Sequence, residues 1–187
     1  VSRIMNDCTS TKEGKYIDYK ITVWSNEGTS DVVNLLDTMS NVKYFNNLRI
    51  HDQNGNRLNI NMPQNGDKSF NYTLPKLPKN GKYIVEYTSV ISDDFTYSTY
   101  LNNQVSASSK DSEGNEIEAQ TAVSLFYSVN VVSKNGVITD NDTIKWTVNI
   151  NDDHLNIGGF TLTDYFNNEK LEKTVTLIKD SEKRTVT

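Results

Sequence analysis

Cysteine is nearly absent from this sequence. Cys8 is the only one among 187 residues, so no disulfide bond can form within the chain. This excludes a disulfide-stapled small scaffold, although it leaves an extracellular location open. Histidine is scarce too, with only His51 and His154. Neither has neighbours that suggest a metal site or a catalytic triad, so we interpret both as surface residues.

Proline, glycine and long apolar runs are also limited. Three prolines and nine glycines exclude a collagen-like or low-complexity chain. No run of about 18 apolar residues occurs, so the sequence contains no candidate membrane-spanning helix, and we expect no direct membrane insertion. The net charge of -5 argues against nucleic acid as a partner, because binding phosphates requires clustered Lys and Arg.

Polar turn-forming and strand-forming residues are abundant instead, with 24 Asn, 19 Thr and 17 Ser. Apolar and polar residues alternate over residues 17–23, 83–90 and 144–150, which is typical of strands with one buried face. Asn-Gly turn signals separate such runs, at Asn54, Asn65, Asn80 and Asn135. The pattern predicts an all-β sandwich or barrel, with no helix longer than about two turns up to Ser128.

The sequence contains an internal repeat. Residues 17–23 (Ile-Asp-Tyr-Lys-Ile-Thr-Val) are similar to residues 144–150 (Ile-Lys-Trp-Thr-Val-Asn-Ile), and in both copies an Asp follows 18 residues after the central aromatic. The repeat predicts a complete domain over residues 1–128 and the start of a related sandwich over 129–187, so we expect the chain to be part of a longer protein. It also predicts that Tyr19 and Trp146 occupy equivalent buried positions.

The repeated segments resemble one family. Residues 132–164, which contain Ile-Lys-Trp-Thr-Val-Asn-Ile-Asn and then Phe-Thr-Leu-Thr-Asp, resemble the opening of collagen-adhesin A-type domains. These are immunoglobulin-like modules of Gram-positive surface adhesins and pilins. Residues 19–26, 34–39, 83–87 and 101–107 resemble the stalk form of the same superfamily. The resemblance implies tandem immunoglobulin-like β-sandwiches, the second one incomplete in this chain.

The resemblance also implies a covalent chemistry. In that family a Lys amine and an Asn amide can form an isopeptide bond assisted by a buried acid, because burial favours the neutral amine and the protonated acid. In domain one, Asp37 matches the acid and Asn103 (or Asn102) the asparagine, with Arg3 at the Lys position. A guanidinium stays protonated and is not a usable nucleophile, so we expect no such bond there.

In domain two, Lys134 matches the lysine and Asp164 the acid, while the asparagine would fall beyond Thr187. At most, autocatalytic isopeptide formation is therefore expected in a complete second domain, and no other enzymatic activity. A different register of the first strand would make Lys12 or Lys15 the nucleophile in domain one.

Other candidates have simpler interpretations. The segment 52–56 resembles part of a calcium loop, but its Gly spacing does not fit an EF-hand, and we expect a hairpin turn there and no metal. A thioester at Cys8 would need a glutamine partner, and nothing in the local sequence pairs Gln104 or Gln120 with Cys8, so we expect no cross-link through Cys8 or Thr9. Dispersed aromatic residues in a β protein belong to the core or its rim more often than to a glycan-stacking surface. We interpret Trp24, Tyr97 and Tyr100 in this way.

The sequence and the resemblance together favour a non-enzymatic segment of a bacterial surface adhesin or pilin that needs no cofactor. Such a segment mediates or presents attachment to a host matrix protein or glycan, and we expect an extracellular, cell-wall-anchored location. In the family, collagen binders hold a ligand between two sandwiches, which would place a groove near residues 126–134. The alternatives are a purely structural stalk module and an accessory β-sandwich of a secreted glycan-degrading enzyme.

Overall fold

The computed structural model describes residues 3–152, 154–155, 157–165, 175–179 and 182–186. Every regular element in these ranges is a β-strand, which confirms the predicted all-β class. The strands are β1 (Arg3–Glu13), β2 (Tyr16–Glu27), β3 (Val33–Ser40), β4 (Val42–Asp52), β5 (Ser69–Leu74), β6 (Lys82–Ile91), β7 (Thr99–Lys110), β8 (Glu116–Tyr127), β9 (Val132–Ile138), β10 (Ile144–Ile150), β11 (Val175–Lys179) and β12 (Glu182–Val186).

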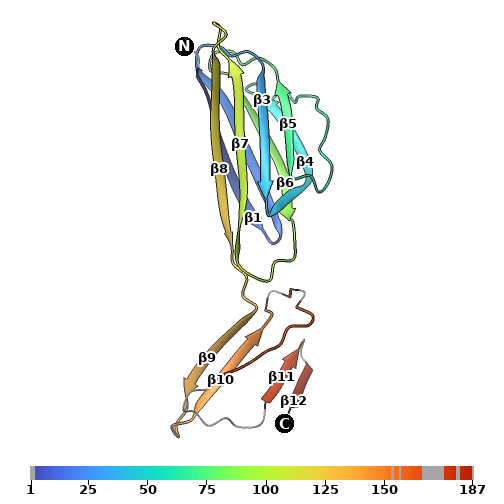
Figure 1. Cartoon of the computed structure of the whole chain (residues 1–187), viewed down its shortest axis with the longest axis vertical. Coiled ribbons are helices and arrows are strands. Elements are labelled where there is room, and N and C mark those ends of the chain that lie inside the picture. The colour runs from blue at the N-terminus through green and yellow to red at the C-terminus, as the bar shows by residue number, and fades with distance from the viewer. Residues whose placement is uncertain (1–2, 153, 156, 166–174, 180–181, 187) are drawn as a thin grey trace. The chain divides into compact units, whose positions relative to one another are not determined.

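The first eight strands form a sandwich of two four-stranded sheets (Figure 1). Sheet A has the strand order β1-β2-β6-β4, and sheet B has the order β5-β3-β7-β8. All neighbouring strands in both sheets are antiparallel. The sandwich predicted for the first copy is therefore present, and it ends at Tyr127.

Strict alternation between buried and exposed residues places the core between the two sheets. In β3, every second residue from Val33 to Met39 is buried, and β6 and β7 follow the same pattern. This is the outcome expected for antiparallel strands with one face on the core. Burial of these apolar side chains is the main stabilising contribution to the sandwich. The largest fully buried residues are Tyr19, Tyr87, Ile17, Ile21, Leu35, Leu48, Ile50, Leu74, Leu77 and Leu101.

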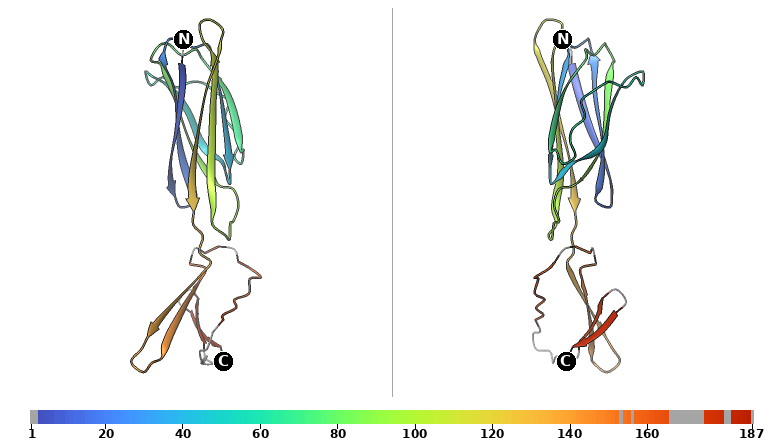
Figure 2. Two further views of the ribbon diagram at one scale, coloured as in Figure 1. Left: turned by 60° about the vertical axis from the view of Figure 1, so that its left-hand side comes forward. Right: turned by 90° about the vertical axis from the view of Figure 1, so that its right-hand side faces the viewer.

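Two edge strands carry the chain into and out of the sandwich. β1 pairs with β2 along its whole length, from Arg3 opposite Glu27 to Glu13 opposite Tyr16. β8 pairs with β7 over its full length in the other sheet. β1 and β8 lie against each other and run in the same direction, so the chain enters the sandwich at one end and leaves it at the other (Figures 1 and 2).

After the sandwich, β9 and β10 form an antiparallel hairpin. Trp146 lies opposite Gly136, where a Cβ atom would come within 2.6 Å of the indole ring, so the ring covers the hairpin backbone. Trp146 is 38% exposed, whereas Tyr19 is 1% exposed. The prediction that the two aromatics occupy equivalent buried positions is therefore wrong. Within the described residues β10 pairs only with β9, and Trp146 packs on its own hairpin instead of between two sheets.

By compactness the chain divides into two units, Val1–Asn156 and Ile157–Thr187. The second unit contains the hairpin of β11 and β12, in which Lys179 pairs with Glu182. In the part of the chain that the structure describes, no helix is long and apolar enough to cross a membrane. The division into domains at residues 128 and 129 stays a prediction.

Candidate functional site

A small polar cluster lies in the middle of the apolar core. Asp37 of β3, Tyr87 of β6 and Asn103 of β7 are at most 1% exposed. The Tyr87 hydroxyl donates to Asp37 Oδ2 at 2.8 Å, and Asn103 Nδ2 donates to the same oxygen at 3.2 Å. Asn103 Nδ2 also lies 2.6 Å from the Tyr87 oxygen. The structure thus brings together two residues that the sequence placed 66 positions apart, and adds a tyrosine to them.

Sequence periodicity explains how the cluster forms. Asp37 lies between Leu35 and Met39 in the inward phase of β3, so its side chain must enter the core. Asn103 has the same position between Leu101 and Val105 in β7. Two polar residues in otherwise apolar inward positions are costly unless they form hydrogen bonds, and Asp37 and Asn103 bond each other.

Burial changes the acidity of the cluster. Desolvation raises the pKa of Asp37 to about 7, although the hydrogen bonds from Tyr87 and Asn103 oppose this rise. Burial, followed by the nearby charge of Asp37, raises the pKa of the Tyr87 hydroxyl far above its ordinary value. Asp37 is therefore a carboxyl group that can hold a proton near neutral pH, as a proton-transferring acid requires.

Hydrogen bonding in the cluster is incomplete. Among the described residues, Asp37 Oδ1, Asn103 Oδ1 and the Tyr19 hydroxyl are buried without a hydrogen-bond partner. Such groups cost free energy in a core, because they have lost their hydrogen bonds to water without gaining others. The amide carbonyl of Asn103 is the group that a nucleophile would attack.

The strand that would supply a nucleophile is β1, and the assignment of Arg3 to the lysine position of that strand stays a prediction. Arg3 pairs with Glu27 at the beginning of β1, and its side chain lies outside the described residues. Among residues 7–13, the part of β1 whose side chains the structure describes, Cys8 is the buried one, at 7% exposed. Burial raises the pKa of the Cys8 thiol to about 12, and the charge of Asp37 is the next contribution. Sequence reasoning missed Cys8 as a neighbour of Asp37, although its position in the inward phase of a first strand could have indicated it.

The lysines proposed as substitutes do not lie at the cluster. Lys12 Nζ lies 5.3 Å from the centre of the Tyr127 ring, and Lys15 Nζ pairs with Asp94 at 3.5 Å on the surface. Every lysine whose side chain the structure describes is at least partly exposed. The first domain therefore contains the acid and the amide of the expected chemistry next to a thiol, with no amine beside them in this part of the chain.

The candidates of the second domain lie on the surface. Lys134 in β9 is exposed, pairs with Val148 and places its Nζ 4.3 Å from the centre of the Trp146 ring. Asp164 is also exposed, in a segment without regular structure. Their role in an isopeptide bond stays a prediction for a longer chain.

The acidic turns use their carboxylates internally. Asp52 Oδ1 accepts hydrogen bonds from the backbone N–H groups of Asn54 and Asn56, at 2.8 and 2.9 Å. Asp111 does the same for Glu113 and Asn115. These are Asx-type turns, as the hairpin interpretation of residues 52–56 requires. The described residues contain no group of three or more His, Cys, Asp or Glu that is arranged to hold a metal ion.

The other candidate residues from the sequence lie on different faces of the two sheets. Gln104 and Gln120 point to the outer face of sheet B, while Cys8 points into the core, so a cross-link between them has no geometric basis. Trp24 lies on the outer face of sheet A, away from Tyr100 on sheet B. Tyr100 packs against Phe126, with ring centres 5.2 Å apart, and both rings are more than half exposed, so Tyr100 does not belong to the core.

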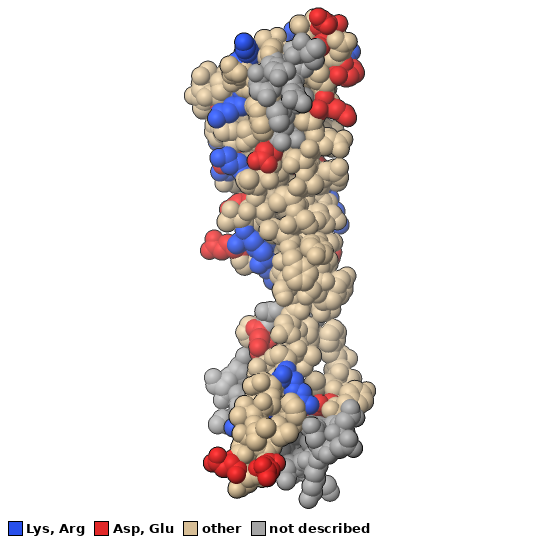
Figure 3. Space-filling view, turned by 90° about the vertical axis from the view of Figure 1, so that its left-hand side faces the viewer, with Lys and Arg blue, Asp and Glu red and all other residues tan. Residues whose placement is uncertain are grey.

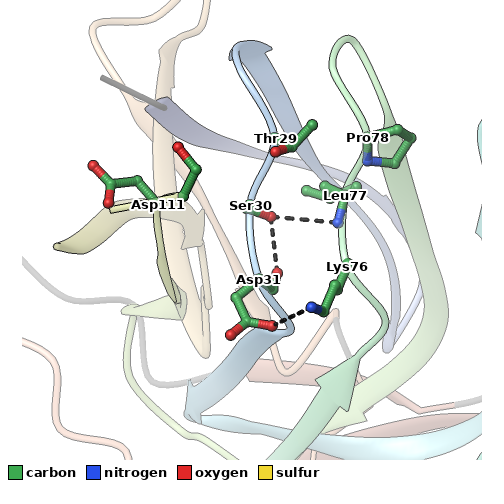
Figure 4. A pocket seen from close by; sticks show the side chains of 8 residues that line it. Thr29, Ser30, Asp31, Lys76, Leu77, Pro78 and Asp111 are labelled. Carbon is green, nitrogen blue, oxygen red and sulfur yellow. Dashed lines mark hydrogen bonds and ion pairs between the residues drawn. The ribbon is translucent and has the colours of Figure 1, made fainter. Parts of the chain in front are cut away.

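A cleft of about 560 Å³ opens at the end of the sandwich where the β7–β8 turn lies (Figure 4). Asp31 pairs there with Lys76 at 3.5 Å, and the backbone N–H of Val32 holds the pKa of Asp31 below its ordinary value. Ser30 Oγ lies 3.4 Å from the Leu77 nitrogen. These contacts join two loops, so we assign the cleft a structural role.

Three solved structures are similar to this chain. The collagen-binding domain from a Staphylococcus aureus adhesin is 9% identical, with a TM-score of 0.49, over 65% of this chain and 97% of that one. The RrgA Jo.In complex is 12% identical, with a TM-score of 0.48, over 63% and 76%. The collagen-binding subdomain of the Enterococcus faecalis surface protein ACE is 10% identical, with a TM-score of 0.43, over 66% and 94%. No protein-family model and no curated protein matches the sequence.

Proposed function

We propose that this chain is a non-enzymatic, force-bearing segment of a bacterial surface adhesin or pilin. The observation that carries the proposal is the path of the chain through the sandwich. It enters through β1 at one end and leaves through β8 at the other, as a module linked in series in a fibre requires (Figure 1). The motifs that resemble adhesin and pilin modules support the same proposal.

Tension between the two ends would load the hydrogen bonds in shear. Pulling on the beginning of β1 slides it along β2, and pulling on the end of β8 slides it along β7. β1 is paired over 11 residues and β8 over 12, so many hydrogen bonds must break together before either strand moves. A force perpendicular to the strand would instead break its hydrogen bonds one at a time, and the strand would separate at much lower force.

Single-molecule force spectroscopy tests this proposal. In one geometry the full chain is held at its N- and C-termini. In the other, it is held at the N-terminus and at a cysteine introduced by Ser112→Cys in the exposed β7–β8 turn, at the end of the sandwich where β1 begins. Unfolding of the sandwich is recognised by its length gain, about 3.5 Å for each released residue.

We expect a several-fold higher unfolding force in the first geometry than in the second. Equal forces, or a weaker response between the termini, would contradict a force-bearing role. Solid-phase binding to collagen, fibrinogen and mucin then separates an attachment module from a pure stalk, because a stalk binds none of them. An accessory module of a glycan-degrading enzyme would be indicated by a catalytic domain elsewhere in the full-length protein.

A further inference from the structure

The two outer faces of the sandwich differ in charge. On sheet A, charged side chains point outward from the three adjacent strands β2, β6 and β4, among them Lys20, Glu86 and Arg49. On sheet B, every outward side chain is uncharged over residues 34–40 of β3, 100–108 of β7 and 120–126 of β8. Figure 3 shows the sheet B side, to the right, as largely uncharged below the upper end of the sandwich. In a chain with 23% charged residues, such a face is unusual.

This uncharged face is hollowed at its centre. A depression of about 270 Å³ is lined by short outward side chains on two adjacent rungs of sheet B. One rung is Thr38, Gln104 and Ala122, and the next is Ser40, Asn102 and Ser124. The small residues keep the floor low, and the amides and hydroxyls supply hydrogen-bonding groups across three strands.

The polar groups of the depression are oriented and available. Ser124 Oγ lies 2.6 Å from Asn102 Oδ1 and donates to it, which leaves the Asn102 amide N–H groups for another acceptor. In the part of the chain that the structure describes, the side chains of Thr38, Ser40 and Gln104 form no hydrogen bond with protein groups. Hydrogen-bond donors and acceptors from both amide and hydroxyl side chains therefore converge on one small area, as in ligand sites.

An aromatic platform forms the next rung. Tyr100 and Phe126 face each other across β7 and β8 and are 57% and 58% exposed, with ring centres 5.2 Å apart. Asn41, whose φ is 64°, donates from Nδ2 to the Tyr100 carbonyl oxygen at 2.8 Å and so anchors the backbone of the platform. Exposed aromatics that are held in place offer apolar area at little entropic cost on binding.

We propose that this face of sheet B binds a neutral oligosaccharide. The apolar face of one sugar ring packs on Tyr100 and Phe126, and the hydroxyls of the next ring bond with Asn102, Gln104 and Thr38. The absence of Lys and Arg from the face favours neutral over sulfated or sialylated glycans, because anionic groups form their strongest hydrogen bonds with cationic side chains. At about 270 Å³ the depression is smaller than most small-molecule pockets, which have volumes of about 300–1,000 Å³. The site is independent of the force-bearing function.

The test uses the full chain, labelled with ¹⁵N, and a panel of oligosaccharides read by amide chemical-shift changes. The neutral members are N-acetyllactosamine, chitotetraose, cellotetraose and maltotetraose. The charged members are 3′-sialyllactose and a heparin tetrasaccharide. We expect at least one neutral member to shift amides of β7 and β8 with a dissociation constant in about the millimolar range, and the charged members to leave them unchanged.

Variants assign the binding to this face. Tyr100→Ala with Phe126→Ala should weaken the neutral glycan at least tenfold, and Gln104→Ala severalfold. The matched control is Tyr16→Ala with Phe45→Ala, a second aromatic pair with ring centres 5.0 Å apart on the outer face of sheet A. This control variant should leave the affinity for the neutral glycan unchanged.

The proposal is overturned if no neutral member binds, if the sheet A pair is the one that matters, or if the charged members bind better. A triple-helical collagen peptide that binds this face with no glycan competing would also overturn it, in favour of a protein ligand. Circular dichroism of each variant shows that the sandwich is folded before its affinity is compared.

Discussion

The amide nitrogen of Asn103 lies 3.2 Å from the Asp37 carboxylate, at the centre of an apolar core. Tyr87 bonds to both residues, and Cys8 of β1 lies close enough for the charge of Asp37 to raise its thiol pKa. An acid that can stay protonated beside an amide is an arrangement suited to amide transfer. The described part of the core contains no amine to accept the acyl group, so we propose that the cluster of domain one is structural in this chain.

The first prediction concerns the pH dependence of stability. The pKa of Asp37 is raised to about 7 in the folded state, above its ordinary value of 3.8, so the unfolded chain loses this proton at lower pH. The contribution of Asp37 to the free energy of unfolding is therefore full below about pH 4 and falls as the pH rises through 7. Asp37→Asn, which cannot ionise, should be more stable than the wild type at pH 8 by about 1–3 kcal/mol and should lose this advantage at pH 4.

Urea denaturation at unit intervals between pH 4 and pH 8 measures this difference. Asp94→Asn is the control, because Asp94 is exposed and pairs only loosely with Lys15 on the surface. Its difference from the wild type should change little over the same range. A constant difference between Asp37→Asn and the wild type would mean that Asp37 is already ionised at low pH in the folded state.

The second prediction concerns the Tyr87 hydroxyl. Its hydrogen bond to Asp37 Oδ2 lowers the pKa of the acid against the effect of burial. Tyr87→Phe should therefore destabilise the sandwich by about 1–2 kcal/mol and raise the pKa of Asp37 further. Tyr16→Phe, at a 45% exposed position, is the matched control and should have little effect. Chemical denaturation gives the stability, and ¹³C carboxyl titration gives the pKa; an unchanged titration would contradict the assigned bond.

The third prediction concerns covalent chemistry. The intact mass of the chain should equal the sequence mass, because no lysine of the described residues lies at Asn103. Cys8→Lys would place an amine in the core, where burial favours its neutral form. Attack on the Asn103 amide carbon would form an amide bond and release ammonia, with Asp37 transferring the proton. We expect this variant to be one ammonia lighter by mass spectrometry, with the lost mass mapped to Asn103.

Two further variants separate this chemistry from a packing effect. Cys8→Lys combined with Asp37→Ala should keep the full mass, because the proton-transferring acid is gone. Cys8→Met shows whether the site accepts a longer side chain. If Cys8→Lys folds and yet keeps its full mass, Cys8 does not face the amide. A mass deficit in the unmodified chain at Asn102 or Asn103 would instead make Lys12 or Lys15 the nucleophile.

The fourth prediction concerns the reactivity of Cys8. The thiol is 7% exposed and its pKa is raised to about 12, so very little thiolate forms near neutral pH. Ellman's reagent should react with it at least a hundredfold more slowly in the folded chain than in urea. A Ser112→Cys variant, with a thiol in an exposed turn, gives the rate of an accessible site in the same chain. Equal rates at both sites would show that β1 opens readily.

Local patterns in the sequence were sufficient for the strands and for part of the site. Alternation over residues 17–23 and 83–90 predicted β2 and β6, because a strand with one buried face must repeat every two residues. The resemblance to adhesin modules singled out Asp37 and Asn103, and the structure shows that alternation in β3 and β7 turns both inward. Which strands become neighbours in each sheet, by contrast, depends on contacts between residues far apart in the sequence. Nothing local indicated that Tyr87 of β6 would reach across from sheet A to bond Asp37 of sheet B.

Register and packing between the sheets account for the differences from expectation. Alignment of the repeats placed Arg3 at the lysine position, which stays a prediction, whereas the burial of Cys8 opposite Ile21 follows only from the pairing of β1 with β2. Trp146 matches Tyr19 in sequence, yet burial depends on a second sheet to cover it, and β10 pairs only with β9 among the described residues. The uncharged face of sheet B combines residues of β3 with residues of the β7–β8 hairpin, which is far from β3 in the sequence. Alternation is a property of neighbouring residues, whereas these features arise from contacts between distant ones.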